Sequence, residues 1–108
     1  MALSPVRISM PSEAKKGEAV EIKALVRHPM ETGYRVDTMG QLVPRNILTE
    51  LAVTYNGAEI FRMKMAQGIA ANPFLSITMR AGETGELVFT WTGDQGTEIV
   101  ERKTLTVI

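Results

Sequence analysis

The sequence predicts an all-β protein. Short runs of apolar residues alternate with polar ones, which is the period of strands with one buried face. All 5 prolines fall at the edges of these runs, where the interior of a sheet loses no backbone donor. The dipeptide Asn56-Gly57 joins two runs and tolerates the positive φ that a tight hairpin turn requires. We therefore expect one domain over residues 1–108, an immunoglobulin-like antiparallel β-sandwich of about seven strands.

The alternation recurs in about seven runs along the chain. Their apolar positions are Val6, Ile8 and Met10; Val20, Ile22, Ala24 and Val26; Ile47, Leu51, Val53 and Tyr55; Phe61, Met63 and Met65; Leu75, Ile77 and Met79; Leu87, Phe89 and Trp91; and Ile99, Leu105 and Val107. Trp91 is the expected aromatic centre of the core. A helix over Glu13–His28 is the main alternative, because that segment is rich in Ala, Glu and Lys. Gly17 interrupts it, and the unbroken alternation from Val20 to Val26 favours a strand.

Composition excludes several classes of function. The 12 basic and 12 acidic residues balance, whereas a nucleic-acid binder needs a basic excess to neutralise phosphates. The chain has no cysteine and one histidine, so we expect no thiolate chemistry, no metal centre and no cofactor. No apolar run is long enough to span a membrane. Met1–Arg7 does not resemble a leader, which predicts a cytoplasmic protein or one exported with help.

The segment Arg27–Asn46 breaks the strand pattern. Loops of this length are uncommon in compact domains unless they bind something or are disordered. This one carries apolar residues rather than the composition of a flexible linker, namely Met30, Tyr34, Val36, Met39, Leu42 and Val43. It is a candidate contact surface, or a loop that packs over one end of its own sandwich.

A second unusual segment is Ile69–Phe74, where small residues precede Asn72-Pro73. A plain turn explains this composition, and so does a small-residue surface that accommodates a partner chain.

Catalytic candidates are few. His28 could serve as a general base with help from Glu31 or Asp37, because its ordinary pKa lies near neutrality. None of the serines lies in the sequence context of an activated nucleophile. A histidine that hydrogen-bonds locally to hold the loop is the favoured interpretation.

The chain resembles the SoxZ family, the Z subunit of the SoxYZ sulfur-carrier complex of bacterial thiosulfate oxidation. The most specific match is His28-Pro29-Met30-Glu31-Thr32-Gly33. Supporting matches follow in family order, namely Ala14–Glu18, Pro44–Ile47, Tyr55–Gly57, Ala70–Phe74 and Phe89–Thr92. The hairpin Gly93–Gly96 is less acidic than is usual in the family, and we expect it to be a solvent-facing turn.

The resemblance implies a non-catalytic subunit without a cofactor. Its partner would be a SoxY-type subunit that holds thiosulfate-derived sulfur on the cysteine of a C-terminal arm. It further implies transient contacts with other Sox enzymes, and a periplasmic protein exported with its partner. The expected partner-binding residues are His28, Pro29, Met30, Glu31, Thr32, Gly33, Tyr34, Arg35, Ala71, Asn72, Pro73 and Phe74. Without the family motifs, a generic immunoglobulin-like scaffold or binding module would account for the composition and the strands.

Overall fold

A computed structural model describes residues 5–108. Residues 1–4, which belong to the segment inspected for a leader, lie outside the described part. The elements are all strands, and their bounds are β1 Val6–Ser9, β2 Glu13–Ala14, β3 Ala19–Val26, β4 Leu48–Tyr55, β5 Ala58–Lys64, β6 Phe74–Arg80, β7 Gly85–Gly93 and β8 Glu98–Val107. The strand favoured over Val20–Val26 is confirmed and the alternative of a helix over residues 13–28 is wrong, because β3 buries every second side chain against the opposite sheet.

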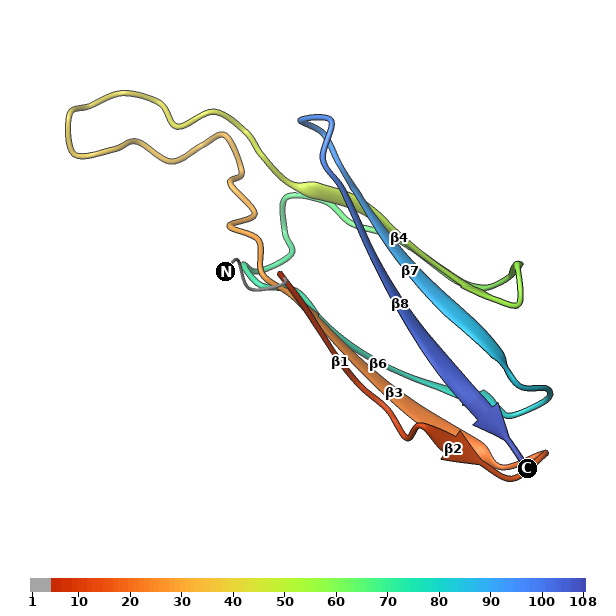
Figure 1. Cartoon of the computed structure of the whole chain (residues 1–108). Helices are drawn as coiled ribbons and strands as arrows, with labels where there is room; N and C mark the ends of the chain where they lie inside the picture. Colours follow the sequence, from red (N-terminus) through yellow and green to blue (C-terminus); the bar gives the residue numbers. More distant parts are fainter. Residues whose placement is uncertain (1–4) are drawn as a thin grey trace, which may run out of the picture.

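The strands form two sheets that pack face to face (Figure 1). One has the order β1-β3-β6, and the other has the order β2-β8-β7-β4-β5. This confirms the immunoglobulin-like β-sandwich. Two details differ from the expectation of about seven antiparallel strands. The two-residue strand β2, which the chain reaches by crossing from one sheet to the other after β1, is an eighth strand too short to show a period. Its pairing with β8 is parallel, so the sandwich is not antiparallel throughout.

The core lies between the inner faces of the two sheets. β3 contributes its alternate residues from Val20 to Val26, all nearly inaccessible to solvent. Across from them, β7 contributes Phe89 and Trp91, whose ring centroids are 6.1 Å apart in a stacked arrangement. Trp91 is 2% exposed, which confirms it as the central aromatic. Adjacent aromatic rings of this kind contribute about 0.5–1.5 kcal/mol beyond the area that they bury.

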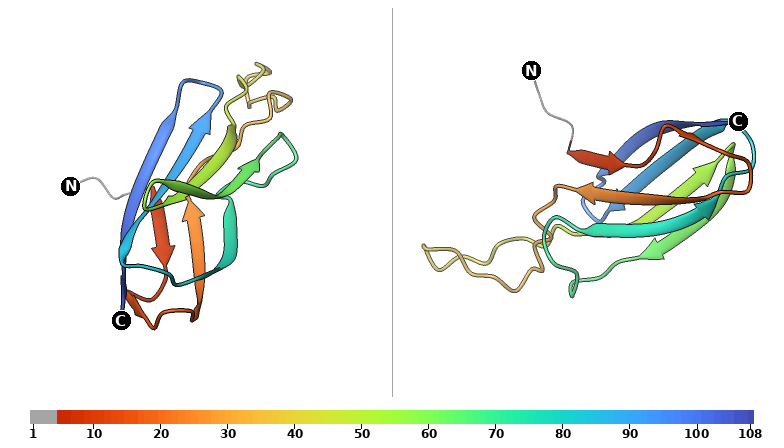
Figure 2. Two further views of the ribbon diagram at one scale, coloured as in Figure 1. Left: turned by 90° about the vertical axis from the view of Figure 1, so that its right-hand side faces the viewer. Right: turned by 90° about the horizontal axis from the view of Figure 1, so that it is seen from below.

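Both long sides of the sandwich are open. β1 and β8 run along one side, in different sheets, and β5 and β6 run along the other (Figure 2). Side chains near these edges are less buried than the centre of the core, and Met63 and Leu75 are examples. The two open sides and one long loop are therefore where this fold offers surface to another molecule. Within residues 5–108, no helix has the length and apolar character needed to cross a bilayer.

Candidate functional site

The most prominent surface feature is the segment 27–46, here called the excursion, which projects from one end of the sandwich (Figure 1). It extends a molecule whose principal dimensions are 57 × 30 × 20 Å and whose radius of gyration is 16.2 Å. A compact domain of this length would have a radius of about 13 Å. Four of its apolar side chains are largely exposed, and they are Tyr34 (76%), Val36 (56%), Met39 (83%) and Leu42 (63%).

The tip of the excursion, residues 36–42, has a defined turn despite its exposure. The carboxylate of Asp37 accepts hydrogen bonds from the backbone N–H groups of Met39 and Gln41, both at 2.9 Å. An isolated bridge pairs Val36 with Leu42 across the turn. An aspartate that bonds the amide two residues on is a recognised turn former. The apolar side chains of the tip are thus presented on a turn held by its own backbone.

At the root of the excursion, residues 28–33, the side chains of His28 and Met30 are by contrast buried. Met30 is 5% exposed, and its thioether sulfur accepts a hydrogen bond from the backbone N–H of Leu48 at 3.2 Å. Its φ of 49° is uncommon for a residue with a side chain. Surrounding contacts must over-determine such a conformation, because it costs of order 1–3 kcal/mol. Met30 therefore anchors the loop in the core of its own sandwich.

His28 joins the two segments that the sequence singled out. The backbone N–H of His28 donates to the side-chain oxygen of Asn72 at 2.9 Å, and the backbone N–H of Asn72 donates to the carbonyl of His28 at 2.8 Å. The ring nitrogen Nδ1 of His28 accepts a hydrogen bond from the backbone N–H of Met30 at 3.0 Å. Nδ1 is therefore unprotonated, and the neutral imidazole has its proton on Nε2. This geometry confirms the local structural interpretation of His28.

The surroundings of His28 favour the neutral ring. Burial lowers the pKa of His28 below its ordinary value, and the neighbouring Asn46 side chain and Asp94 carboxylate oppose that shift. The side-chain oxygen of Asn46 is itself buried, and no donor in residues 5–108 reaches it with hydrogen-bonding geometry. Asn46 therefore opposes the lowering of the His28 pKa because its side-chain oxygen lies near the ring, without a formed hydrogen bond. A buried histidine engaged at Nδ1 suits a structural role better than proton transfer.

Asp94 in the β7–β8 hairpin fastens the far end of the excursion. Its carboxylate forms an ion pair with Arg45 at 2.6 Å and accepts a hydrogen bond from the backbone N–H of Ile47 at 3.0 Å. Arg45, and after it the Ile47 amide, lower the pKa of Asp94. Residues 94–96 are exposed as expected of a solvent-facing turn, but the side chain of Asp94 is only 16% exposed because it turns toward the excursion. Sequence reasoning missed this role because nothing local links a hairpin to a loop end nearly fifty positions away.

Glu31 stabilises the root of the excursion through both its backbone and its side chain. Its backbone pairs with that of Asn46 through two hydrogen bonds of 2.8 Å, and its carboxylate forms an ion pair with Arg35 at 2.7 Å. The hydrogen bond from Arg35 is the main reason why the pKa of Glu31 is lowered. Glu31 and Asp37, the carboxylates considered as helpers of a general base, are thus both engaged in shaping the loop.

The segment Ala71–Phe74 lies beside the root and lines an apolar groove. The groove has a volume of about 370 Å³ and is lined by Met63, Ile69, Ala70, Ala71, Asn72, Pro73, Phe74 and Leu75. Phe74 is 62% exposed there. Gln67 lies in the connection between β5 and β6, which also contains Ala71–Pro73. Its side-chain amide donates to the hydroxyl of Tyr34 at 3.4 Å, and this hydrogen bond links the β5–β6 connection to the excursion. The two segments that the sequence predicted to bind a partner are therefore neighbours in space.

The predicted residues divide into a solvent-accessible group of ten, six exposed and four partly exposed, and a buried group of two. Pro29, Tyr34, Arg35, Ala71, Asn72 and Phe74 are exposed, and Glu31, Thr32, Gly33 and Pro73 are partly exposed. His28 and Met30 face their own core. A contact surface would consist of the first group, which the second holds in position. Within residues 5–108, no group of three or more His, Cys, Asp or Glu side chains is placed to hold a metal ion.

The fold and this site define a class, an immunoglobulin-like sandwich that exposes several apolar side chains on one anchored loop and in the groove beside it. The sequence profile of one family, described as "Sulphur oxidation protein SoxZ", matches residues 6–104. The chain belongs to the SoxZ family.

Solved structures share the fold at low identity. The sulfur carrier protein SoxY from Chlorobium limicola f thiosulfatophilum superposes with a TM-score of 0.68 at 14% identity, over 98% of this chain and 81% of that one. A superoxide reductase (neelaredoxin) from Ignicoccus hospitalis superposes with a TM-score of 0.71 at 18% identity, over 95% and 80% of the two chains. No curated protein sequence matches the chain. At such identities the likeness shows the fold alone.

Proposed function

We propose that this protein is the non-catalytic subunit of a heterodimeric sulfur carrier. Its partner is a SoxY-type subunit that carries thiosulfate-derived sulfur on the cysteine of a C-terminal arm. Membership of the SoxZ family supports this proposal, and the structural likeness to SoxY makes a pair of similar sandwiches plausible in geometry. In the same proposal the pair works in the periplasm, reaches it with the partner's export signal, and meets other Sox enzymes transiently.

The observation that carries the proposal is the exposed apolar surface built by the excursion and the groove. Tyr34, Met39 and Phe74 are each more than 60% exposed, although the chain has few aromatic residues and buries its largest ones. Large apolar side chains clustered on a surface mark an interaction site. Aromatic residues and methionine are also enriched in the cores of interfaces. A stable complex would bury about 1,200–2,000 Å² in total, which requires the groove as well as the loop.

The absence of cysteine from the sequence is compatible with a position beside a thiol that carries sulfur. Thiolates attack disulfide-type sulfur by exchange, and the sequence of this chain contains no cysteine that could do so. A cysteine placed in the HPMETG motif (His28–Gly33), for example by Thr32→Cys, should attack the partner's cysteine sulfur as a thiolate. The bond from that sulfur to its cargo breaks, the cargo leaves as an anion with the bonding electron pair, and a mixed disulfide between the two chains remains. Unchanged sulfur loading and no mixed disulfide would contradict this expectation.

Titration of the chain with a SoxY-type partner tests the proposal directly. We expect one-to-one association by calorimetry. The double variant Tyr34→Ser/Met39→Ser should weaken it by at least about tenfold, because two apolar anchors are lost. Ile60→Ser is the matched control, since Ile60 is 40% exposed on β5 and lies outside this surface. A wild-type chain that stays monomeric beside the partner would refute the function. Equal weakening by both variants would refute this choice of surface.

A further inference from the structure

The strand β8 breaks the apolar pattern of its inner face. Antiparallel partners that lie directly opposite share a face of the sheet. The inner-face residues Leu87, Phe89 and Trp91 of β7 lie opposite Lys103, Glu101 and Ile99 of β8, in that order. An ammonium group and a carboxylate thus occupy positions between Ile99 and Leu105 where this fold otherwise places apolar side chains.

These two charges border a cavity at the open side of the sandwich. β8 pairs with β2 only at Thr106 and Val107, so among the described strands none pairs with residues 98–104 on that side. The edge strand β1 of the other sheet lies across the opening (Figure 2). The cavity between them has a volume of about 260 Å³ and is lined by Pro5, Val6, Arg7, Ile8, Leu25, Arg27, Glu101 and Lys103.

The lining of this cavity is cationic. Three of its residues are basic (Arg7, Arg27 and Lys103) and one is acidic (Glu101). Within residues 5–108, none of the three basic side chains forms an ion pair. A concave surface lined by one sign of charge concentrates the potential and attracts the opposite ion. Guanidinium groups also match the geometry of oxyanions, to which they can donate two hydrogen bonds at once.

A simpler explanation covers only part of this arrangement. Inward-pointing charges on an edge strand discourage pairing with another chain, and that would account for Glu101 and Lys103. It does not account for Arg7 of β1 or for Arg27, which directly follows β3, and both of these line the same cavity. The convergence of basic residues from both sheets calls for an anionic occupant.

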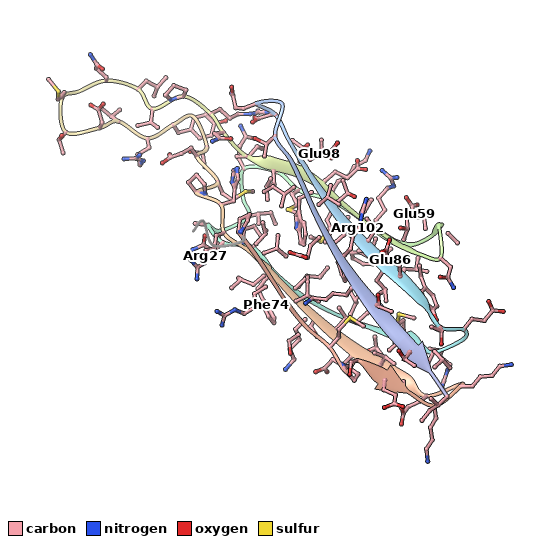
Figure 3. All side chains as sticks on the ribbon, in the orientation of Figure 1. Arg27, Glu59, Phe74, Glu86, Glu98 and Arg102 are labelled. Carbon is pink, nitrogen blue, oxygen red and sulfur yellow. The ribbon has the colours of Figure 1, made fainter. Side chains whose placement is uncertain are left out.

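We infer that the cavity bordered by Arg7, Arg27 and Lys103 is a binding site for a tetrahedral sulfur oxyanion. The choice of sulfur rests on the proposed function, in which the cargo derives from thiosulfate. Arg27 directly precedes the HPMETG motif, and Figure 3 shows it at the foot of the excursion. A sulfo group on the partner's arm would therefore find this site at the margin of the proposed contact surface, and a free sulfur oxyanion would present the same chemistry.

Nuclear magnetic resonance titration of the full chain tests this inference. The probes are sodium sulfate and S-sulfocysteine, with sodium chloride varied to hold the ionic strength constant. We expect saturable shifts of the backbone amides of Arg7, Leu25 and Glu101 with at least one probe. Tighter binding of S-sulfocysteine than of sulfate would indicate a tethered sulfo group as the occupant, and equal binding would indicate the free oxyanion.

Two variants on one strand separate a site from general charge. Lys103→Met should weaken binding by about tenfold or more, the loss expected for one charge-assisted hydrogen bond. Arg102→Met removes the same charge one residue away, but Arg102 lies opposite Val88 on the outer face, so binding should change less than about twofold. Absence of saturable shifts with both probes, or equal weakening by both variants, would overturn the inference.

The outcome is distinguishable from the fate of the proposed function. If the chain associates with a cysteine-armed partner but neither probe binds, the oxyanion site alone fails. If a probe binds at this cavity but no association occurs, the carrier function fails and the oxyanion site stands without its assigned source.

Discussion

The root and the tip of the excursion belong to one loop but differ in burial and in where their hydrogen bonds go. At the root, His28 and Met30 are at most 7% exposed, and their hydrogen bonds reach the β4 strand and the β5–β6 connection. At the tip, Met39 is 83% exposed and the turn depends only on contacts within itself. The difference teaches that two members of the most distinctive sequence motif, His28 and Met30, face the core of their own domain. They hold the exposed part of the loop in place.

The largest effect should come from placing a charge at the root. Met30→Asp puts a carboxylate into a site that is 5% exposed, and the unpaired charge should destabilise the fold by about 3 kcal/mol or more. Urea denaturation measures the change. Met39→Asp at the exposed tip is the matched control and should stay within about 0.5 kcal/mol of the wild type. Similar losses in both variants would mean that root and tip are equally packed.

The second largest effect should come from breaking the hydrogen bond between His28, in the excursion, and Asn72, in the β5–β6 connection. Asn72→Ala removes the acceptor for the His28 N–H and places alanine at a φ of 53°, so a loss of about 2–3 kcal/mol is expected. Asn72→Gly removes only the acceptor and should lose about 1–2 kcal/mol. Thermal unfolding of both variants separates the two contributions. An alanine variant as stable as the glycine variant would contradict the backbone part of this account.

Two glycines compare the root and the tip at the level of the backbone. Gly33 (φ 90°) and Gly40 (φ 78°) both lie in the left-handed region, where an L-residue costs about 1–2 kcal/mol. A Cβ on Gly33 would also lie 3.0 Å from the Cβ of Arg45, whereas nothing lies within 4 Å of one on Gly40. Gly33→Ala should therefore be the more destabilising by about 1 kcal/mol in chemical denaturation. The reverse order would show that the root yields more easily than the tip.

The smallest effect should be the pH dependence of the root. Burial lowers the pKa of His28 in the folded state, so the unfolded chain binds the proton more readily. The stability should therefore be complete above the ordinary histidine pKa of about 6.5 and decline as the pH falls toward the lower folded value. The lowered pKa values of Glu31 and Asp94 act only further down, below the ordinary range of carboxyl groups.

Denaturation midpoints between pH 7 and about pH 5 measure this dependence apart from the carboxylates. His28→Asn keeps an acceptor for the N–H of Met30 but does not titrate, so its stability should be flat over that range. A wild-type protein with an equally flat profile would show that His28 does not take part in acid destabilisation.

Local rules were sufficient to predict the strands. The side-chain period of two and the Asn56-Gly57 turn depend on neighbouring residues only, and the strand over Ala19–Val26 followed from them. The two-residue strand β2 was not predicted, because two residues are too few to show an alternation. Its pairing with β8 also joins residues from the two ends of the chain. The family motifs likewise identified the chain's family directly from the sequence.

The candidate site was only partly predictable. Apolar composition marked both the excursion and the Ala71–Phe74 segment as unusual. That Asn72 clasps His28, and that Asp94 fastens Arg45 and Ile47, depends on which strands lie side by side. Likewise, nothing in the sequence distinguishes Glu101 and Lys103 from charged residues on the outer face of a strand. Only the register with β7 shows that they lie on the inner face of the sheet.

The sequence by itself determined the class of fold, the position of the long loop and the family, because these depend on local periodicity and on motifs. Only the tertiary structure decided which motif residues are anchors and which are exposed. It also decided that basic residues from two sheets meet at one cavity. The physical reason is that burial and charge proximity are properties of strand pairing and sheet packing, which bring together residues that are distant along the chain.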